Sequence, residues 1–203
     1  MRTVRDIPLH IVDIHPIAGQ GPLEKVLQQG SLYPVYQPIV NLSDASIHAH
    51  EALIRGPRGS DLHTPDALLR AAAMECLGYE FEYACVVAAL RSWGKMDVPG
   101  RLFVNMSAAV LTQLIRTRGP DELLKLISGL GVLSRMLVLE ITEHERVDDM
   151  DELAEVVATV REAGVSLALD DFGDGRSSLR LWSQLKPEVV KIDKYFTKNI
   201  SQH

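Results

Sequence analysis

The feature that most constrains the fold is a regular alternation of apolar, strand-like runs with helical stretches in the second half of the chain. The runs Leu137-Val138-Leu139 and Leu167-Ala168-Leu169 are nearly continuous in apolar residues, as is typical of parallel strands buried on both faces. Because parallel strands need crossover connections, the alternation predicts a parallel sheet. The extended stretches expected here are Leu102–Asn105, Met136–Ile141, Ser166–Leu169 and Val189–Ile192, with two helical stretches before Leu130 and a helix from Asp149 to Ala163.

Such a sheet can close into a (β/α) barrel or remain an open, doubly wound sheet. No Gly-x-Gly-x-x-Gly sequence follows the first strand, which disfavours a dinucleotide-binding open sheet. The fold class predicted is therefore α/β, with a TIM-like (β/α) barrel as the favoured architecture.

The first half of the chain has a different pattern. Residues 1–22 are interrupted by prolines and glycines and are interpreted as an arm or linker, with the folded domain spanning 23–203. Two extended stretches, Tyr33–Leu42 and Ile47–Ile54, are joined by a connection so short that they must pair antiparallel. The expected helices are a short one over Leu23–Gln29 and a longer one that begins at Thr64-Pro65-Asp66 and runs, with an interruption near Gly78, to Met96.

Composition narrows the functional classes. Of the 203 residues, 46% are apolar and 24% charged, which is typical of a folded globular protein. Cys76 and Cys85 are the only cysteines, and the sequence has no Cys-x-x-Cys pair and no Cys/His cluster. We therefore expect neither a disulfide framework nor a structural zinc site, and we expect a reducing, cytoplasmic location. The net charge of −6 and the lack of a basic run argue against a nucleic-acid polymer as partner, and no apolar stretch in this segment is long enough for a bilayer.

Polar side chains follow strand after strand at the point where each strand ends. In a (β/α) barrel the carboxyl ends of the strands face one rim, where such enzymes hold their active sites. Glu51, in the second extended stretch, can join this group. The strand-end residues are Asn105, Glu140, Asp170, Asp171 and Lys191.

Several carboxylates at one place raise each other's pKa values unless cations compensate them. Oxygen ligands without Cys or His favour hard cations such as Mg²⁺, Mn²⁺ or Ca²⁺ over zinc. The adjacent acids Asp170 and Asp171 suggest a carboxylate that bridges two ions, the usual equipment for cleaving a phosphodiester, with Lys191 positioning or deprotonating the attacking water. Two other interpretations stay open: individual acids at strand ends serve as helix caps, or Glu51 and Glu140 form the carboxylate pair of a glycosidase, which leaves the two aspartates and Lys191 without a role.

Six short motifs occur in order along residues 23 to 200. They are Gln37-Pro38-Ile39-Val40, Glu51-Ala52-Leu53-Ile54-Arg55, Phe103-Val104-Asn105-Met106-Ser107, Leu139-Glu140-Ile141-Thr142-Glu143, Asp170-Asp171-Phe172-Gly173 with Ser177-Ser178-Leu179, and Lys191-Ile192-Asp193. Together these motifs resemble the EAL-domain family of bacterial cyclic di-GMP phosphodiesterases. The resemblance implies a (β/α) barrel whose first strand is antiparallel to its second, and hydrolysis of cyclic di-GMP to linear pGpG with Mg²⁺ or Mn²⁺.

The resemblance also implies roles for individual residues. One metal would be held by Glu51, Asn105, Glu140 and Asp170, and the second by Asp170 and Asp171. Lys191 would contact the nucleophilic water, and Glu143 would steady the loop after Asp171. The positions that match substrate contacts are Gln37, Leu53, Arg55 and Asp193.

The sequence also departs from the family. Asp174 and Arg176 stand where members usually carry Thr and Tyr. The chain ends at His203, soon after the sixth strand, before the family's further glutamate and glutamine, so we expect a barrel of about six of the eight strands. From these departures follow an alternative function, a receptor that binds cyclic di-GMP without cleaving it, and the expectations of a homodimer that covers the open sheet edges and of further signalling domains in the parent protein.

Overall fold

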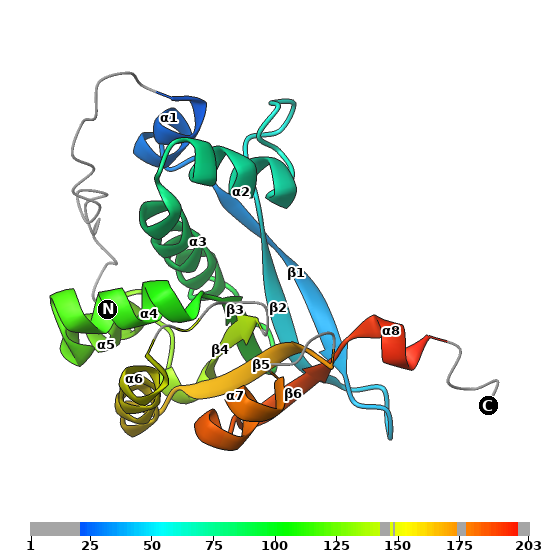
Figure 1. The fold of residues 1–203 in the computed structure, drawn as a ribbon. Coiled ribbons are helices and arrows are strands. Elements are labelled where there is room, and N and C mark those ends of the chain that lie inside the picture. Colours follow the sequence, from blue (N-terminus) through cyan, green and yellow to red (C-terminus); the bar gives the residue numbers. More distant parts are fainter. Residues whose placement is uncertain (1–20, 143–146, 148, 174–177, 199–203) are drawn as a thin grey trace. The chain divides into compact units, whose positions relative to one another are not determined.

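The computed structural model describes residues 21–142, 147, 149–173 and 178–198 (Figure 1). The chain divides into two compact units, one comprising residues up to Gly100 with Gly129–Val132, and the other comprising Arg101–Ser128 with the residues from Leu133 onward. Most of the expected N-terminal arm lies outside the described residues. The first unit contains α1 (Pro22–Gln28), β1 (Tyr33–Val40), β2 (Ile47–Arg55), α2 (Pro65–Met74) and α3 (Gly78–Trp93).

Strands β1 and β2 form the antiparallel pair that their short connection predicts. Gln37 is paired with Glu51 and Tyr33 with Arg55, and the register shifts only near the turn, between Ile39 and Val40. The prediction of an antiparallel first strand is therefore confirmed. Because residues directly opposite each other in such a pair point to the same side, this register decides which side chains share a face.

One face of this hairpin packs against α3. The Tyr36 hydroxyl donates a hydrogen bond of 3.0 Å to the carbonyl of Ala89, and the ring of Trp93 lies 5.4 Å from that of Tyr36 and 5.3 Å from that of His50. Ala52, which is paired with Tyr36 and lies on the same face of the hairpin as His50, is 4% exposed. The opposite face of the hairpin therefore carries the odd-numbered residues of its central part, including Gln37 and Glu51.

Helices α1, α2 and α3 share an apolar core to which Leu23, Leu68 and Phe81 contribute. Thr64 caps α2 as expected, accepting a hydrogen bond from the backbone N–H of Ala67. The interruption expected near Gly78 falls at Glu75–Leu77, between α2 and α3. Glu75, in this interruption, caps α1: its carboxylate oxygens accept hydrogen bonds from the backbone N–H groups of Leu23 and Glu24 at 2.9 and 3.0 Å.

The second unit contains four parallel strands in the order β3-β4-β5-β6. Leu102 is paired with Leu137, and Leu139 with Leu167, and all four of these side chains are buried. The parallel pairing and the burial on both faces confirm the sequence prediction. The elements are β3 (Arg101–Asn105), α4 (Ala108–Arg118), α5 (Pro120–Gly129), a 3₁₀ turn (Ser134–Met136), β4 (Leu137–Thr142), α6 (Met150–Glu162), β5 (Ser166–Phe172), α7 (Ser178–Leu185), β6 (Val189–Ile192) and α8 (Lys194–Thr197).

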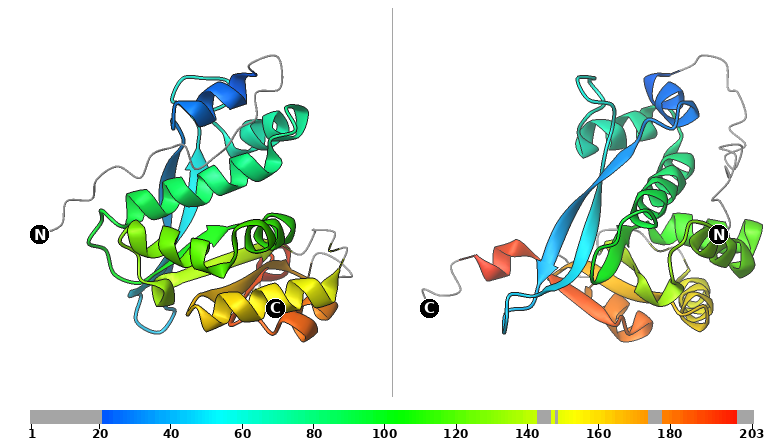
Figure 2. Two further views of the ribbon diagram at one scale, coloured as in Figure 1. Left: turned by 90° about the vertical axis from the view of Figure 1, so that its left-hand side faces the viewer. Right: turned by 180° about the vertical axis from the view of Figure 1, so that it is seen from behind.

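Helix α6 follows its predicted apolar stripe, because Leu153, Val156, Val157 and Val160 are all buried. It contacts β5 and α7, beside which it runs in Figure 2. Helices α7 and α8 were not predicted: α7 is short and buries Leu181 and Leu185, whereas its Leu179 and Trp182 are exposed. None of the helices in the described part of the chain has the length and apolar character needed to cross a bilayer.

Candidate functional site

Two carboxylates and one ammonium group meet in the C-terminal halves of β4, β5 and β6. The Lys191 Nζ atom lies 2.8 Å from Glu140 Oε1 and 3.0 Å from Asp170 Oδ2. The side chain of Glu140 is completely buried, and those of Asp170 and Lys191 are 17% and 26% exposed. The structure thus brings together three of the residues that the sequence predicts to lie at one rim.

The strand register explains this convergence. In the parallel ladders Asn105 is opposite Glu140, and Thr142 is opposite Asp170. Glu140 therefore lies within β4, and Asp170 lies near the end of β5. Lys191 is the last but one residue of β6, at the same end of the sheet. Asn105 is exposed at the end of β3, one strand away from Glu140.

The charges at this site are strongly coupled. Burial by itself would lower the pKa of Lys191, but the negative charges of Glu140 and Asp170 and their hydrogen bonds outweigh it and raise the pKa above its usual value. Lys191 is therefore a fixed cation at neutral pH. The two carboxylates and the ammonium group thus lie together in a partly buried place.

Asp171 has an unusual backbone conformation. Its φ angle is +55°, in the left-handed region that residues other than glycine seldom adopt. Its backbone N–H donates a hydrogen bond of 2.9 Å to Asp170 Oδ1, and the ladder between β5 and β6 shifts register between Leu169 and Phe172. The two successive aspartates thus stand at a bulge, a device that is common beside active sites.

In the first unit the predicted substrate contacts share one face of the hairpin. Gln37 is directly opposite Glu51, and Leu53 and Arg55 follow at alternate positions of β2. Gln37 is exposed, and the other three are half-buried. The guanidinium of Arg55 donates a hydrogen bond of 2.9 Å to the carbonyl of Ile54. The hairpin therefore groups a carboxylate, a carboxamide, an apolar side chain and a guanidinium.

Two of the predicted residues stand apart from these groups. Asp193 caps α8, where its carboxylate accepts the backbone N–H of Tyr195 at 2.7 Å, so the structure shows for it the helix-capping role that is usual for an acid after a strand. Its contact with substrate stays a prediction. Glu143 lies outside the described residues, as do Asp174 and Arg176.

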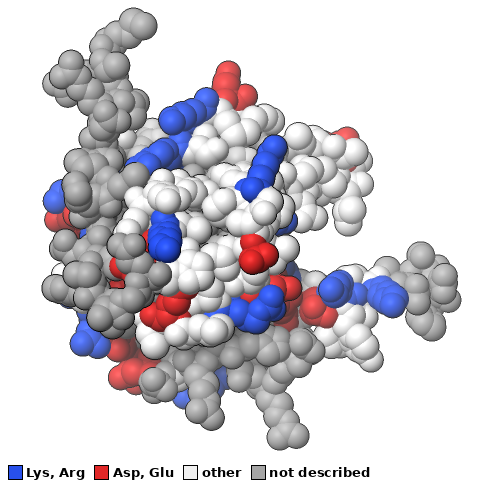
Figure 3. All heavy atoms as spheres, turned by 90° about the horizontal axis from the view of Figure 1, so that it is seen from above, with Lys and Arg blue, Asp and Glu red and all other residues white. Residues whose placement is uncertain are grey.

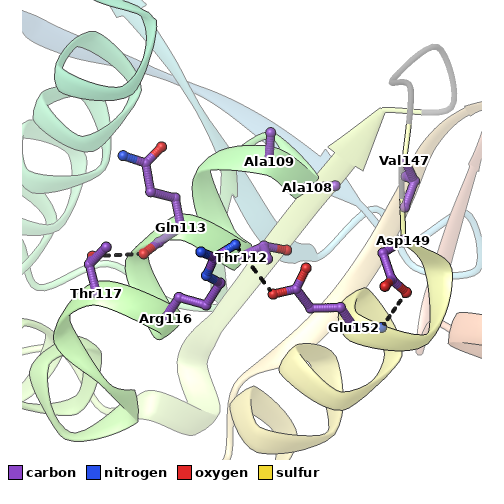
Figure 4. A pocket seen from close by; sticks show the side chains of 9 residues that line it. All are labelled: Ala108, Ala109, Thr112, Gln113, Arg116, Thr117, Val147, Asp149 and Glu152. Carbon is purple, nitrogen blue, oxygen red and sulfur yellow. Dashed lines mark hydrogen bonds and ion pairs between the residues drawn. The ribbon is translucent and has the colours of Figure 1, made fainter.

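Sequence reasoning did not identify a pocket of about 440 Å³ between α4 and the beginning of α6 (Figure 4). Thr112, Gln113 and Arg116 line it from α4, and Asp149 and Glu152 line it from the start of α6. Arg116 and Glu152 form an ion pair of 3.8 Å across it, and Asp149 caps α6. No pattern in the sequence marks this pocket, because its lining combines exposed helix residues such as Gln113 and Arg116 with the buried Ala108 and the half-buried Val147.

The donor set at the strand ends fits a hard divalent cation. Oxygen atoms of Glu140 and Asp170 lie within 4.8 Å of one another, close enough to share an ion, and both belong to carboxylates. A parallel α/β unit with carboxylates and a lysine at its strand ends defines the class of (β/α)-barrel domains with an acidic site.

Comparison with known proteins identifies the family. The family model named EAL domain matches residues 21–203, so the chain belongs to the EAL-domain family. It is 31% identical over 191 residues to a probable cyclic di-GMP phosphodiesterase, PdeB, of Escherichia coli, covering 89% of this chain and 36% of that protein. It is 30% identical over 183 residues to the cyclic di-GMP phosphodiesterase NbdA of Pseudomonas aeruginosa, covering 88% of this chain and 23% of that protein. The chain thus spans about a third or less of these relatives.

Solved structures support the same assignment. A calcium and cyclic di-GMP complex of Klebsiella pneumoniae BlrP1 matches 84% of this chain and 42% of that chain, with a TM-score of 0.73 and 26% identity. Bacillus subtilis YkuI, in complex with cyclic di-GMP and calcium, matches 88% of this chain and 46% of that chain, with a TM-score of 0.72 and 27% identity. These EAL-domain matches confirm the (β/α)-barrel class, represented here by six strands.

Proposed function

We propose that this chain is the cyclic di-GMP-binding part of a phosphodiesterase that hydrolyses cyclic di-GMP to linear pGpG. The observation that carries the proposal is the meeting of Glu140, Asp170 and Lys191 at three neighbouring strand ends. The names of the relatives and the cyclic di-GMP complexes of the structural neighbours support the choice of substrate.

Glu140 and Asp170 would hold the first Mg²⁺ or Mn²⁺ ion, and we propose that Glu51 and Asn105 complete its ligand set. Asp171 would join Asp170 at a second ion. Bound ions of this kind supply Lewis acidity toward a phosphoryl oxygen and lower the pKa of water.

Lys191 has the position for a distinct task. Its ammonium is held by two carboxylates, so it can donate a hydrogen bond to a water molecule and orient it toward the phosphorus atom. Arg55 offers a planar fork of donors that matches a phosphate, and Gln37 and Leu53 lie on the same face of the hairpin. Glu143 would steady the loop after Asp171.

A second function deserves a separate test: a receptor that binds cyclic di-GMP without cleaving it. The sequence feature that favours it is the pair Asp174 and Arg176, which departs from the family in the loop after Asp171. We also propose a cytoplasmic site of action, a homodimer and further signalling domains in the parent protein. The short share of the relatives that this chain spans supports the last of these.

The experiment is a metal-dependent turnover assay with purified protein. The parent protein is incubated with cyclic di-GMP and Mn²⁺ or Mg²⁺, and the products are separated by chromatography. Asp170→Asn should abolish formation of pGpG, whereas Asp97→Asn, at an exposed acid outside the helices and strands, should leave it unchanged. Binding with no turnover by the unmodified protein supports the receptor. If cyclic di-GMP is neither bound nor cleaved by protein whose circular dichroism is that of a folded α/β domain, both functions are refuted.

A further inference from the structure

The loop after β2 has a fixed conformation. The backbone N–H of Gly56 donates to the carbonyl of His63 at 3.1 Å, and the backbone N–H groups of Ser60 and His63 donate within the loop to Pro57 and Ser60 at 3.2 Å. Position 56 must be glycine, because an added Cβ atom would meet the carbonyl oxygen of Leu62 at 1.9 Å. The loop that these bonds close therefore presents its side chains from a defined backbone.

That loop places two side chains against Tyr33, the first residue of β1. The guanidinium carbon of Arg58 lies 5.6 Å from the centroid of the Tyr33 ring, within the range of a cation–π contact. The Tyr33 hydroxyl and His63 Nε2 share a hydrogen bond of 3.0 Å. Tyr33 is thus hydrogen-bonded to His63, and its ring contacts the guanidinium of the exposed Arg58.

The register puts this group on the face that carries the proposed substrate contacts. Tyr33 is directly opposite Arg55 and is separated from Gln37 by two alternations of β1. Tyr33, Gln37, Glu51, Leu53 and Arg55 therefore lie on the same side of the hairpin. Arg58 continues that side beyond Arg55, at the end of the hairpin away from its turn.

The aromatic neighbour favours an arginine over a lysine as the cation at position 58, because a guanidinium packs well on an aromatic ring. On the face drawn in Figure 3, basic and acidic side chains are interspersed. The planar guanidinium of an arginine offers two parallel N–H donors, and the matching pair of acceptors on a nucleobase is O6 and N7 of guanine.

We propose that Arg58 is a specificity-determining residue that reads the O6 and N7 edge of one guanine of the cyclic dinucleotide, with Tyr33 and His63 as positioning residues. The inference rests on the proposed binding of cyclic di-GMP and adds the group that distinguishes guanine from adenine. Adenine keeps N7 but presents an amino group in place of O6, so it cannot accept both hydrogen bonds.

The test measures the dissociation constants of three ligands by titration calorimetry on the 203-residue chain with Ca²⁺ present. The ligands are cyclic di-GMP, cyclic di-IMP, which keeps O6 and N7, and cyclic di-AMP, which does not. The variants are Arg58→Lys, which keeps the charge and loses the fork, Arg58→Ala, and Arg70→Lys as a matched control at an exposed arginine of α2. We expect both Arg58 variants to weaken cyclic di-GMP and cyclic di-IMP about tenfold, with cyclic di-AMP and the control unchanged.

Each other outcome identifies what is wrong. Normal binding of cyclic di-GMP by Arg58→Lys, with loss in Arg58→Ala, would mean that Arg58 acts by charge alone and would overturn the proposal. So would an equal loss for all three ligands, or a loss for cyclic di-GMP with cyclic di-IMP unaffected. If the unmodified chain binds none of the ligands, the proposed function itself fails and this inference falls with it, a result that is distinct from failure of the Arg58 variants.

Discussion

Replacing Lys191 by methionine removes a positive charge that contacts both Glu140 and Asp170. Breaking a buried ion pair by removing one partner costs about 3–5 kcal/mol. Because the Lys191 and Asp170 side chains are 26% and 17% exposed, water screens part of this loss, and we expect about 2–4 kcal/mol. Repulsion between carboxylate oxygens within 4.8 Å gives a similar figure, about 3 kcal/mol at an effective dielectric constant of about 20.

The assay is thermal unfolding with and without Mn²⁺. For a chain of this size each kcal/mol lowers the melting temperature by about 2–4 °C, so a loss of about 2–4 kcal/mol should make Lys191→Met melt roughly 4–16 °C below the unmodified protein. Mn²⁺ should raise the melting temperature of the variant more than that of the unmodified protein, since the ion binds a site that has lost its competing cation. Lys125→Met, at an exposed lysine of α5, is the matched control.

Two results would refute this reasoning. One is a Lys191→Met variant that melts within about 2 °C of the control, because that would mean that the ion pairs contribute nothing to the folded state. The other is an equal effect of Mn²⁺ on both proteins, because Lys191 would then not compete with the ion. Either result would also weaken the assignment of Glu140 and Asp170 as metal ligands.

Two further predictions concern stability. Burial would raise the pKa of Glu188, but the hydrogen bonds from Arg161 and from the backbone N–H of Leu167 lower it. A lowered pKa stabilises the fold above the ordinary glutamate pKa, and this stabilisation is lost as the pH falls through the lowered value. Because the Glu188 side chain is 40% exposed and partly screened by water, Glu188→Gln should cost no more than about 1 kcal/mol at pH 7, and progressively less as the pH falls below the ordinary glutamate pKa, by urea unfolding. Glu75→Ala removes the cap from α1 and should cost about 1–2 kcal/mol, whereas unchanged urea midpoints would contradict the capping role.

Much of the fold could be predicted because its signals are local. The helix start at Thr64, the stripe of α6 and the apolar runs of β4 and β5 each depend on a few neighbouring residues. Helix α7 could not be predicted in the same way. Its eight residues include only two buried leucines, and its exposed Leu179 and Trp182 blur the helical stripe.

The site could be predicted as a set of residues, but not as a set of contacts. Glu140 and Lys191 are far apart in sequence, and their distance of 2.8 Å depends on the registers of two ladders that no single strand encodes. The cap that Asp193 forms on α8 was missed for the same reason as that helix, which has only four residues. The contacts of Arg58 and His63 with Tyr33 depend on the conformation of a loop whose composition indicated no more than a turn.

The bulge at the end of β5 bears on the proposal that two successive aspartates, Asp170 and Asp171, bind metal ions. In a regular strand, neighbouring side chains point to opposite faces of the sheet. Asp170 and Asp171 would then point away from each other and could not both bind ions on the same face. The left-handed φ of +55° at Asp171 and the register shift against β6 interrupt that alternation. A left-handed residue other than glycine costs about 1 kcal/mol or more, and the hydrogen bond from the Asp171 N–H to Asp170 offsets part of this cost. Glycine would remove the strain, but it would also remove the carboxylate, so an aspartate at this bulge is the residue expected where a second ligand is needed.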